Sequence, residues 1–355
     1  MNTSESISWL KENSLYDKAK KISEDLKNVY SSSLGVIDEK IVIIGDTGFA
    51  DKNISSLMSG AYYLAAEKLR LDAKLIMQTP KQSNDPAHED VANGLKDLDN
   101  GSVIIVSLSN KLGHLENIKS FRKMCHKNKH RFLSSLSLGD IKNDKVDRIM
   151  KAINVSYKSL QMRDEIIQKQ LNKGSEAHIT TKAGTDLHFN IKSMKAVSAN
   201  GNYKEPGSGG NLPAGEVYIP PNGKRVEGKV VIDGSSRNNK GTTLIKDPIS
   251  LKVENGSITD IEGGKEAKEL QKTLDDASDR AKHPSSLRRI GELGIGINPN
   301  ASIIGATIID EKTLGTAHVA IGSNYWFGGD IYAIVHLDQI FKDPAIKIDG
   351  KLLNI

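Results

Sequence analysis

Short, continuously apolar segments alternate with helical stretches through the first part of this chain. The apolar segments lie at 40–45, 73–78, 102–108 and 130–136. The helical stretches between them lie at 55–71, 89–98 and 115–128. A short apolar run bounded by polar turns is typical of a strand covered on both faces, and strands that are joined by helices run parallel. This alternation therefore predicts a mostly parallel sheet with helices on both faces.

The pattern changes after a long helical stretch at 146–173. Residues 178–191 alternate as in a β-hairpin, residues 198–223 are rich in Gly, Asn and Pro, and short strand patterns recur beyond them. A chain of 355 residues has room for about two domains of roughly 150 residues each. We predict an α/β fold with an N-terminal α/β domain at 1–170, followed by a mixed, β-rich α+β domain at 171–355.

The cysteine content and the hydropathy pattern limit where such a chain can work. Its single cysteine, Cys125, cannot form an internal disulfide, which argues against a secreted, disulfide-stapled scaffold. No apolar run approaches the 18 or so residues of a membrane-spanning helix, and the first residues lack the basic start and apolar stretch of a signal peptide. We therefore expect a cytoplasmic protein with no membrane partner.

Two further segments could be taken for binding sites, but neither has the residues that such a site requires. The basic stretch at 122–131 has few aromatic residues that could stack on bases, and the net charge of the chain is only +5. It therefore predicts a solvated helix end and no nucleic-acid partner. The segment 41–48, IVIIGDTG, lacks both GxGxxG and GxxxxGK[ST]. It predicts an ordinary strand-to-loop transition.

His336 and Asp338 stand out near the C-terminal end, within the apolar segment IYAIVHLDQIF. Side chains at i and i+2 of a strand project from the same face, so the imidazole and the carboxylate lie side by side. Burying both groups is unfavourable by several kcal/mol unless they are paired or bound to a cation. A His–Asp hydrogen bond and a metal site are equally compatible with this pair.

Other candidate ligands favour the metal. His318 lies in a short strand pattern before a Gly/Asn loop, Glu292 lies between glycines, and Glu216 lies on a segment between prolines. Together with His336 and Asp338, they form two histidines and three carboxylates, a ligand set suited to zinc, cobalt or manganese. Five ligands exceed what one catalytic ion usually takes, so the sequence predicts a centre of two divalent ions with a bridging carboxylate.

The order of the surrounding motifs resembles a known family. The segments NLPAGEVYIPP, RIGELGIGINPNA, DEKTLGTAHVAIGSN, FGG and HLD follow one another as in the aminopeptidase T / aminopeptidase S family of cobalt-activated metallo-aminopeptidases and its shorter, leucyl aminopeptidase-like relatives. The resemblance covers about residues 178–355. It implies that the metal ligands are Glu216, Glu292, His318, His336 and Asp338, so that the C-terminal domain at 171–355 carries the catalytic metal site.

The same resemblance implies an activity and a partner. It indicates a hydrolase that removes the N-terminal residue of a peptide with a free N-terminus, and it suggests a homodimer built through the C-terminal domain. In this mechanism two ions activate a water, and Glu292 passes its proton to the leaving amine. Tyr325 matches a family tyrosine and could donate a hydrogen bond to the oxyanion, or simply pack in the YWF cluster. Glu311 departs from the family spacing and is a carboxylate that supports the metal ligands, a proton shuttle or a solvated turn residue.

Two alternatives remain beside the aminopeptidase. An offshoot of the family, the dihydroxypyridine ring-cleaving dioxygenases, uses a single Fe(II) held by two histidines and an aspartate. In that offshoot the position of Glu292 is a histidine, so the glutamate of this chain favours the hydrolase. The second alternative is a non-catalytic binding protein, which has no evident use for five ligand-type residues.

Overall fold

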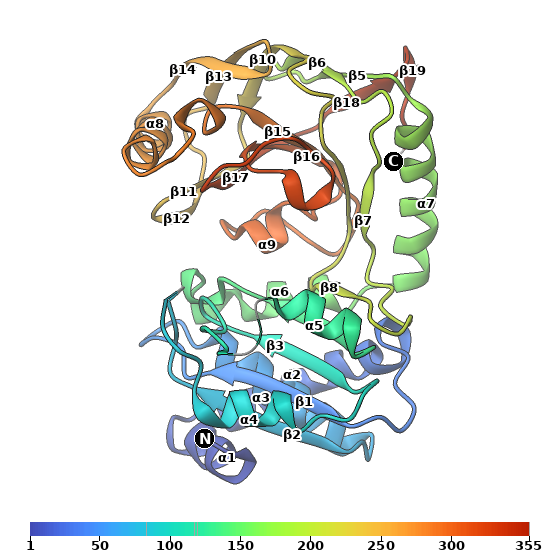
Figure 1. The fold of residues 1–355 in the computed structure, drawn as a ribbon, viewed down its shortest axis with the longest axis vertical. Helices are drawn as coiled ribbons and strands as arrows, with labels where there is room; N and C mark the ends of the chain where they lie inside the picture. Colours follow the sequence, from blue (N-terminus) through green and yellow to red (C-terminus); the bar gives the residue numbers. More distant parts are fainter. Residues whose placement is uncertain (83, 117, 119, 355) are drawn as a thin grey trace. The chain divides into compact units, whose positions relative to one another are not determined.

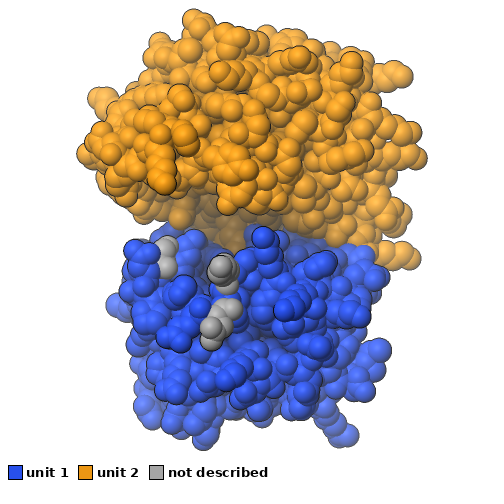
Figure 2. All heavy atoms as spheres, viewed as in Figure 1, with its two compact units in different colours: residues 1–157, 201–214 blue, residues 158–200, 215–355 orange. Residues whose placement is uncertain are grey.

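The structure is a computed structural model that describes residues 1–82, 84–116, 118 and 120–354 (Figure 1). It contains two compact units, which we call unit 1 (residues 1–157 and 201–214) and unit 2 (residues 158–200 and 215–355); Figure 2 shows them in different colours. The boundary predicted after residue 170 falls inside α7 (Tyr157–Lys173). In addition, the segment 201–214 belongs to unit 1, so a single boundary in the chain cannot separate the two units.

Unit 1 is built on a sheet of parallel strands in the order β2-β1-β3-β4-β8. Its strands are β1 (Ile41–Asp46), β2 (Ala73–Gln78), β3 (Val103–Ser107), β4 (Arg131–Ser135) and β8 (Gly209–Asn211). Its helices are α1 (Thr3–Glu12), α2 (Tyr16–Asn28), the π-helical turn η1 (Val29–Ser33), α3 (Ile54–Lys68), α4 (Glu89–Lys96), α5 (Phe121–Lys127) and α6 (Val146–Ile153). The predicted parallel α/β architecture is confirmed.

Helices cover both faces of this sheet because the strands are apolar on both. Val42 and Ile44 of β1 belong to one buried cluster with Val91 of α4. On the other face, α3 packs so close that a Cβ on Gly45 would lie 2.2 Å from Ser59 Oγ. Of the helix predicted over 115–128, residues 117 and 119 lie outside the described part, and α5 covers its second half. The stretch predicted as one helix at 146–173 is two helices, since Asn154 leaves the helical region (ψ 71°).

Unit 2 combines α7 and two further helices with antiparallel strands. The helices are α8 (Lys265–Ser278) and the short α9 (Thr307–Asp310). The strands are β5 (Glu176–Thr180), β6 (Asp186–Asn190), β7 (Val197–Ala199), β9 (Glu216–Ile219), β10 (Val226–Ile232), β11 (Ser235–Asn238), β12 (Gly241–Leu244), β13 (Ile249–Glu254), β14 (Ser257–Glu262), β15 (Ile290–Gly296), β16 (Thr316–Gly322), β17 (His336–Lys342), β18 (Ala345–Ile348) and β19 (Lys351–Leu352).

These strands form two sheets, with orders β14-β13-β10-β6-β5-β18-β19 and β12-β11-β17-β16-β15-β9-β7. The predicted hairpin at 178–191 is confirmed as the antiparallel pair β5–β6. In the second sheet every residue of β15 and β16 is buried, so any polar side chain on these strands must find a partner there. Within the described residues, no helix is long and apolar enough to cross a lipid bilayer.

Candidate metal centre

One face of the second sheet of unit 2 carries all five residues predicted as metal ligands. Strands β9, β15, β16 and β17 are neighbours in this sheet, and Glu292 of β15, Ala320 of β16 and Asp338 of β17 form one row across it. Residues directly opposite in antiparallel strands project to the same side, and so do residues at i and i+2. That side therefore presents the five predicted residues: Glu216, Glu292, His318, His336 and Asp338.

Small residues lie between these polar side chains on the face of the sheet. Ala320 lies between Glu292 and Asp338 in their row, and Gly294 lies opposite His318. A Cβ on Gly294 would lie 2.1 Å from His318 Nε2, so the imidazole lies directly over the glycine. The absence of a side chain at this position is a requirement for the observed orientation of the histidine.

The His336–Asp338 pair adopts the geometry that its spacing predicts. His336 Nε2 lies 3.2 Å from Asp338 Oδ1. Its other nitrogen, Nδ1, lies 2.8 Å from the carbonyl oxygen of Ser323, which can only accept, so Nδ1 carries the proton and donates. This hydrogen bond fixes the tautomer and directs Nε2 toward the carboxylates, which is the arrangement found in histidines that bind metals.

Glu292 connects the two histidines. Its Oε1 lies 3.1 Å from His318 Nε2, and its Oε2 lies 3.6 Å from His336 Nε2. Donor atoms of Glu292, His336 and Asp338 all lie within 4.8 Å of one another. The same holds for a second group, which comprises Glu216, Glu311 and His318. The structure therefore contains side-chain groups that could hold a metal ion.

Acidic neighbours determine the charge of the histidines. Burial disfavours a charged imidazole, but Asp338 and Glu292 outweigh it and raise the pKa of His336 to about 10. Burial likewise opposes charge on His318, and Glu292 together with Asp338 raises its pKa to about 9. Burial would raise the pKa of Asp338, yet His336 holds it well below its ordinary value. A cation that binds here takes the place of these imidazolium protons.

The donor set fits a divalent transition metal. Imidazole nitrogens and carboxylate oxygens are the ligands that iron(II), zinc, manganese and cobalt share in proteins. His318 directs Nε2 toward two of these carboxylates, at 3.1 Å from Glu292 Oε1 and 3.8 Å from Glu216 Oε2. The side chain of His336 is 26% exposed, so the group can be reached from solvent.

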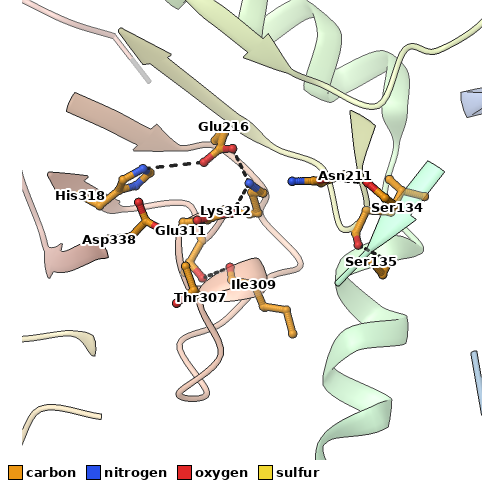
Figure 3. A network of polar contacts seen from close by, with 12 residues as sticks. Ser134, Ser135, Asn211, Glu216, Thr307, Ile309, Glu311, Lys312, His318 and Asp338 are labelled. Atoms are coloured by element: carbon orange, nitrogen blue, oxygen red, sulfur yellow. Dashed lines mark hydrogen bonds and ion pairs between the residues drawn. The ribbon is translucent and has the colours of Figure 1, made fainter. Parts of the chain in front are cut away.

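Glu311 and Lys312 complete the centre, and the sequence analysis identified only the first of them. The Lys312 side chain is fully buried and its Nζ contacts Glu216 and Glu311 (Figure 3). Burial raises the pKa of Glu311 to about 8, against the opposing effect of Lys312. Glu311 is therefore not a solvated turn residue. Lys312 was missed because a lysine after two acidic residues usually indicates an exposed turn.

The aromatic residues after β16 differ from the expectation. Tyr325 is half-exposed and stacks on Tyr332 with ring centroids 4.5 Å apart. The ring that packs against His336 belongs to Trp326, at 4.9 Å between centroids, followed by Phe327 at 6.4 Å. The catalytic role of Tyr325 stays a prediction, and the two neighbouring rings are the additional residues that the structure brings to the site.

Comparisons with known proteins give the centre its context. The family model of 2,5-dihydroxypyridine 5,6-dioxygenase (NicX) matches residues 36–354. The curated 2,5-dihydroxypyridine 5,6-dioxygenase of Pseudomonas putida KT2440 is 27% identical over 190 residues, which is 51% of this chain and 53% of that protein. The match thus spans about half the length of the curated relative.

Two solved structures share the fold. The 2,5-dihydroxypyridine dioxygenase of Pseudomonas putida KT2440 superposes with a TM-score of 0.68 at 18% identity, covering 94% of this chain and 95% of that chain. Wild-type AmpT from Thermus thermophilus superposes with a TM-score of 0.58 at 14% identity, covering 96% and 100%. The aminopeptidase T-like fold implied by the motifs is therefore present in this chain.

The expected activity, in contrast, is wrong. The family match over residues 36–354 and the curated relative indicate a dioxygenase, which is an oxidoreductase, and not a hydrolase, aminopeptidase or protease. The expectation of a hydrolase depends on a single residue, the carboxylate of Glu292. Because both solved structures share the fold of this chain, one residue is too little to separate the two reactions.

Proposed function

This chain belongs to the 2,5-dihydroxypyridine 5,6-dioxygenase family, and from that premise we propose that it opens the ring of a dihydroxylated pyridine with dioxygen. The observation that carries the proposal is the convergence of His336, Asp338 and Glu292 on one sheet face, with donor atoms within 4.8 Å of one another, in a chain that matches this family almost from end to end.

We propose a single iron(II) in place of the two ions expected from the sequence. His336, Asp338 and Glu292 would hold it, and His318 is the next donor because its Nε2 lies 3.1 Å from Glu292 Oε1. Two histidines and one carboxylate with open positions are typical of non-haem iron oxygenases. This centre offers both histidines and, in Glu292 and Asp338, one carboxylate more than that set. When bound, iron(II) supplies the redox chemistry that lets dioxygen react with an aromatic ring.

The chain's own residues would bind and orient the ring. Trp326 packs edge-on against His336 and is itself half-exposed, so it offers an aromatic surface beside the centre. A flat pyridine ring can stack on such a surface and present its hydroxyl groups to the ligands. Asn324 holds this loop in place, since its amide donates to the Gly291 carbonyl and accepts from the Ile331 backbone N–H.

Glu311 is our proposed group for proton exchange with the substrate hydroxyl. Because burial raises its pKa to about 8, the carboxyl can take up or release a proton near neutral pH. It belongs to the same cluster as Glu216 and His318, with donor atoms within 4.8 Å of each other. This assignment keeps the proton-shuttle role predicted for Glu311 and places it in a different reaction.

Oxygen consumption tests the proposal directly. Protein loaded with iron(II) under anaerobic conditions is mixed with aerated 2,5-dihydroxypyridine, and oxygen uptake is followed together with the loss of ring absorbance. We expect one dioxygen consumed per ring opened, and a decrease of about 100-fold or more in Asp338→Asn, because ligand loss exceeds the 10- to 100-fold effect of outer partners. The matched control is Asp260→Asn, an exposed aspartate of β14. Iron-loaded, folded protein that consumes no oxygen with this ring would disprove the proposal.

A further inference from the structure

Lys312 is a lysine whose ammonium group has no access to solvent. Its side chain is 0% exposed, and it follows α9 at the edge of the metal centre. Nζ contacts carboxylate oxygens of Glu216 and Glu311, as Figure 3 shows. A buried lysine is stabilised only when opposite charges surround it closely.

The two carboxylates that bind Lys312 belong to the second candidate metal group. Donor atoms of Glu216, Glu311 and His318 lie within 4.8 Å of one another, which by itself resembles a site for a second ion. The ammonium, however, is already in contact with both carboxylates of that group. A divalent ion placed there would stand beside a fixed positive charge in a dry environment, where repulsion is strong.

The charge balance of the centre supports the same view. Its carboxylates are Glu216, Glu292, Glu311 and Asp338, and with neutral histidines its positive group is Lys312. With all four carboxylates ionised, Lys312 and one divalent ion leave a single negative charge, whereas Lys312 and two divalent ions make the centre positive. Two divalent ions would balance the four carboxylates only if the charge of Lys312 were absent.

We propose that Lys312 is a built-in counter-cation that occupies the second cation position of this centre and restricts it to one divalent ion. The residue thereby separates one-ion from two-ion chemistry on this fold, since a bridged pair of ions is what metal-assisted hydrolysis of this kind uses. The inference concerns the centre on which the proposed function rests, but its measurement is the number of bound ions and not turnover.

Metal stoichiometry tests the role of Lys312. The full chain is freed of metal with a chelator, titrated with Mn²⁺, and examined by elemental analysis after gel filtration and by electron paramagnetic resonance. We expect one Mn²⁺ with an uncoupled signal in the wild type, and two with a coupled signal in Lys312→Met, which keeps the length of the side chain without its charge. Lys240→Met, an exposed lysine paired with Glu269, is the matched control and should bind one ion.

Two results would overturn the proposal: two ions in the wild type, or one ion in a folded Lys312→Met. Should Lys312→Met not fold, Glu216→Gln decides in its place. If Lys312 occupies the position, Glu216 is its partner and not a ligand, so the variant still binds one Mn²⁺ with a Kd within about threefold of the wild type. Loss of the ion in Glu216→Gln would contradict the proposal.

The outcome is independent of the proposed reaction. Protein that binds one ion and consumes no oxygen would refute the dioxygenase and support the role of Lys312. Protein that binds two ions and consumes oxygen would support the dioxygenase and refute the role of Lys312.

Discussion

At the scale of single residues, His336 shows how one side chain can serve both the fold and the centre. It occupies the first position of β17, and its two ring nitrogens have different partners: Nδ1 donates to the Ser323 carbonyl, and Nε2 faces Asp338 and Glu292. The first contact ties the loop after β16 to the strand, and the second belongs to the nitrogen that we propose as a metal ligand. Replacement of this histidine therefore affects both loop position and metal affinity.

Trp326 gives a residue-scale prediction about substrate binding. In Trp326→Leu, a ring substrate loses an aromatic contact worth about 0.5–1.5 kcal/mol. We expect KM for the dihydroxypyridine to rise roughly two- to tenfold, with a smaller change in kcat, in steady-state oxygen-uptake assays. The control is Trp9→Leu, at the other tryptophan of the chain, in α1 of unit 1. An unchanged KM in Trp326→Leu would show that the substrate does not touch this ring.

Cys125 gives a prediction about reactivity. It is the single cysteine of the sequence, it is fully buried in α5, and burial raises the pKa of its thiol to about 12. The reactive thiolate is therefore roughly a thousandfold scarcer than for a thiol of ordinary pKa. We expect a chromogenic disulfide reagent to label the native protein at least about a thousandfold more slowly than the unfolded protein. Rapid labelling of native protein would contradict the packing described for α5.

At the scale of elements, the centre depends on the pairing of β15, β16 and β17. Antiparallel register places Glu292, Ala320 and Asp338 in one row and His318 opposite Gly294 in the next. A shift by one residue would turn every ligand of the shifted strand to the opposite face. In these rows Ala320 lies between Glu292 and Asp338, and Gly294 lies next to His318, so that this alternation of small and polar residues lets the His318 ring lie over the glycine.

Gly294→Ala tests this alternation. The added methyl would lie 2.1 Å from His318 Nε2 and Cε1, so the imidazole must move. We expect metal affinity to fall about tenfold or more and the free energy of unfolding to fall by about 1–3 kcal/mol, the usual effect of overpacking. Calorimetric titration and thermal unfolding measure the two effects separately. Metal affinity equal to that of the wild type would mean that His318 is not a ligand.

At the scale of the whole molecule, all residues of the candidate centre belong to unit 2. Unit 1 has a parallel sheet whose strands are buried on both faces. The distant segment 201–214 adds the strand β8 to this sheet, beside β4. Each unit thus has its own core, and binding of an ion should stabilise them unequally. Homodimerisation through the C-terminal domain stays a prediction, which analytical ultracentrifugation can check.

Hydrogen exchange with and without metal tests this division. A ligand at 100 times its Kd stabilises the unit that binds it by about 2.7 kcal/mol. We expect added Mn²⁺ to slow amide exchange in β9 and β15–β17, while exchange in β1–β4 stays unchanged. The same experiment on Asp338→Asn should show no slowing. Equal protection of both sheets would indicate that the two units unfold together.

The sequence by itself determined the local features. Continuous apolar runs predicted the parallel strands of unit 1, and β2 has the predicted bounds, 73–78. The i, i+2 spacing of His336 and Asp338 predicted a pair on one strand face, and the 3.2 Å contact between them confirms it. The apolar runs follow from burial of a strand on both faces, and the His336–Asp338 pair follows from the two-residue period of a strand. Both are properties of short segments.

Only the tertiary structure decided what each candidate does. Lys312 follows two acidic residues and looks solvated in sequence, but folding places it without water between Glu216 and Glu311. Trp326 lies one residue from the tyrosine that the sequence favoured, and the turn at 325–327 brings Trp326 to His336. Burial and contacts across strands join residues far apart in the chain, and their energies depend on neighbours that no local pattern contains.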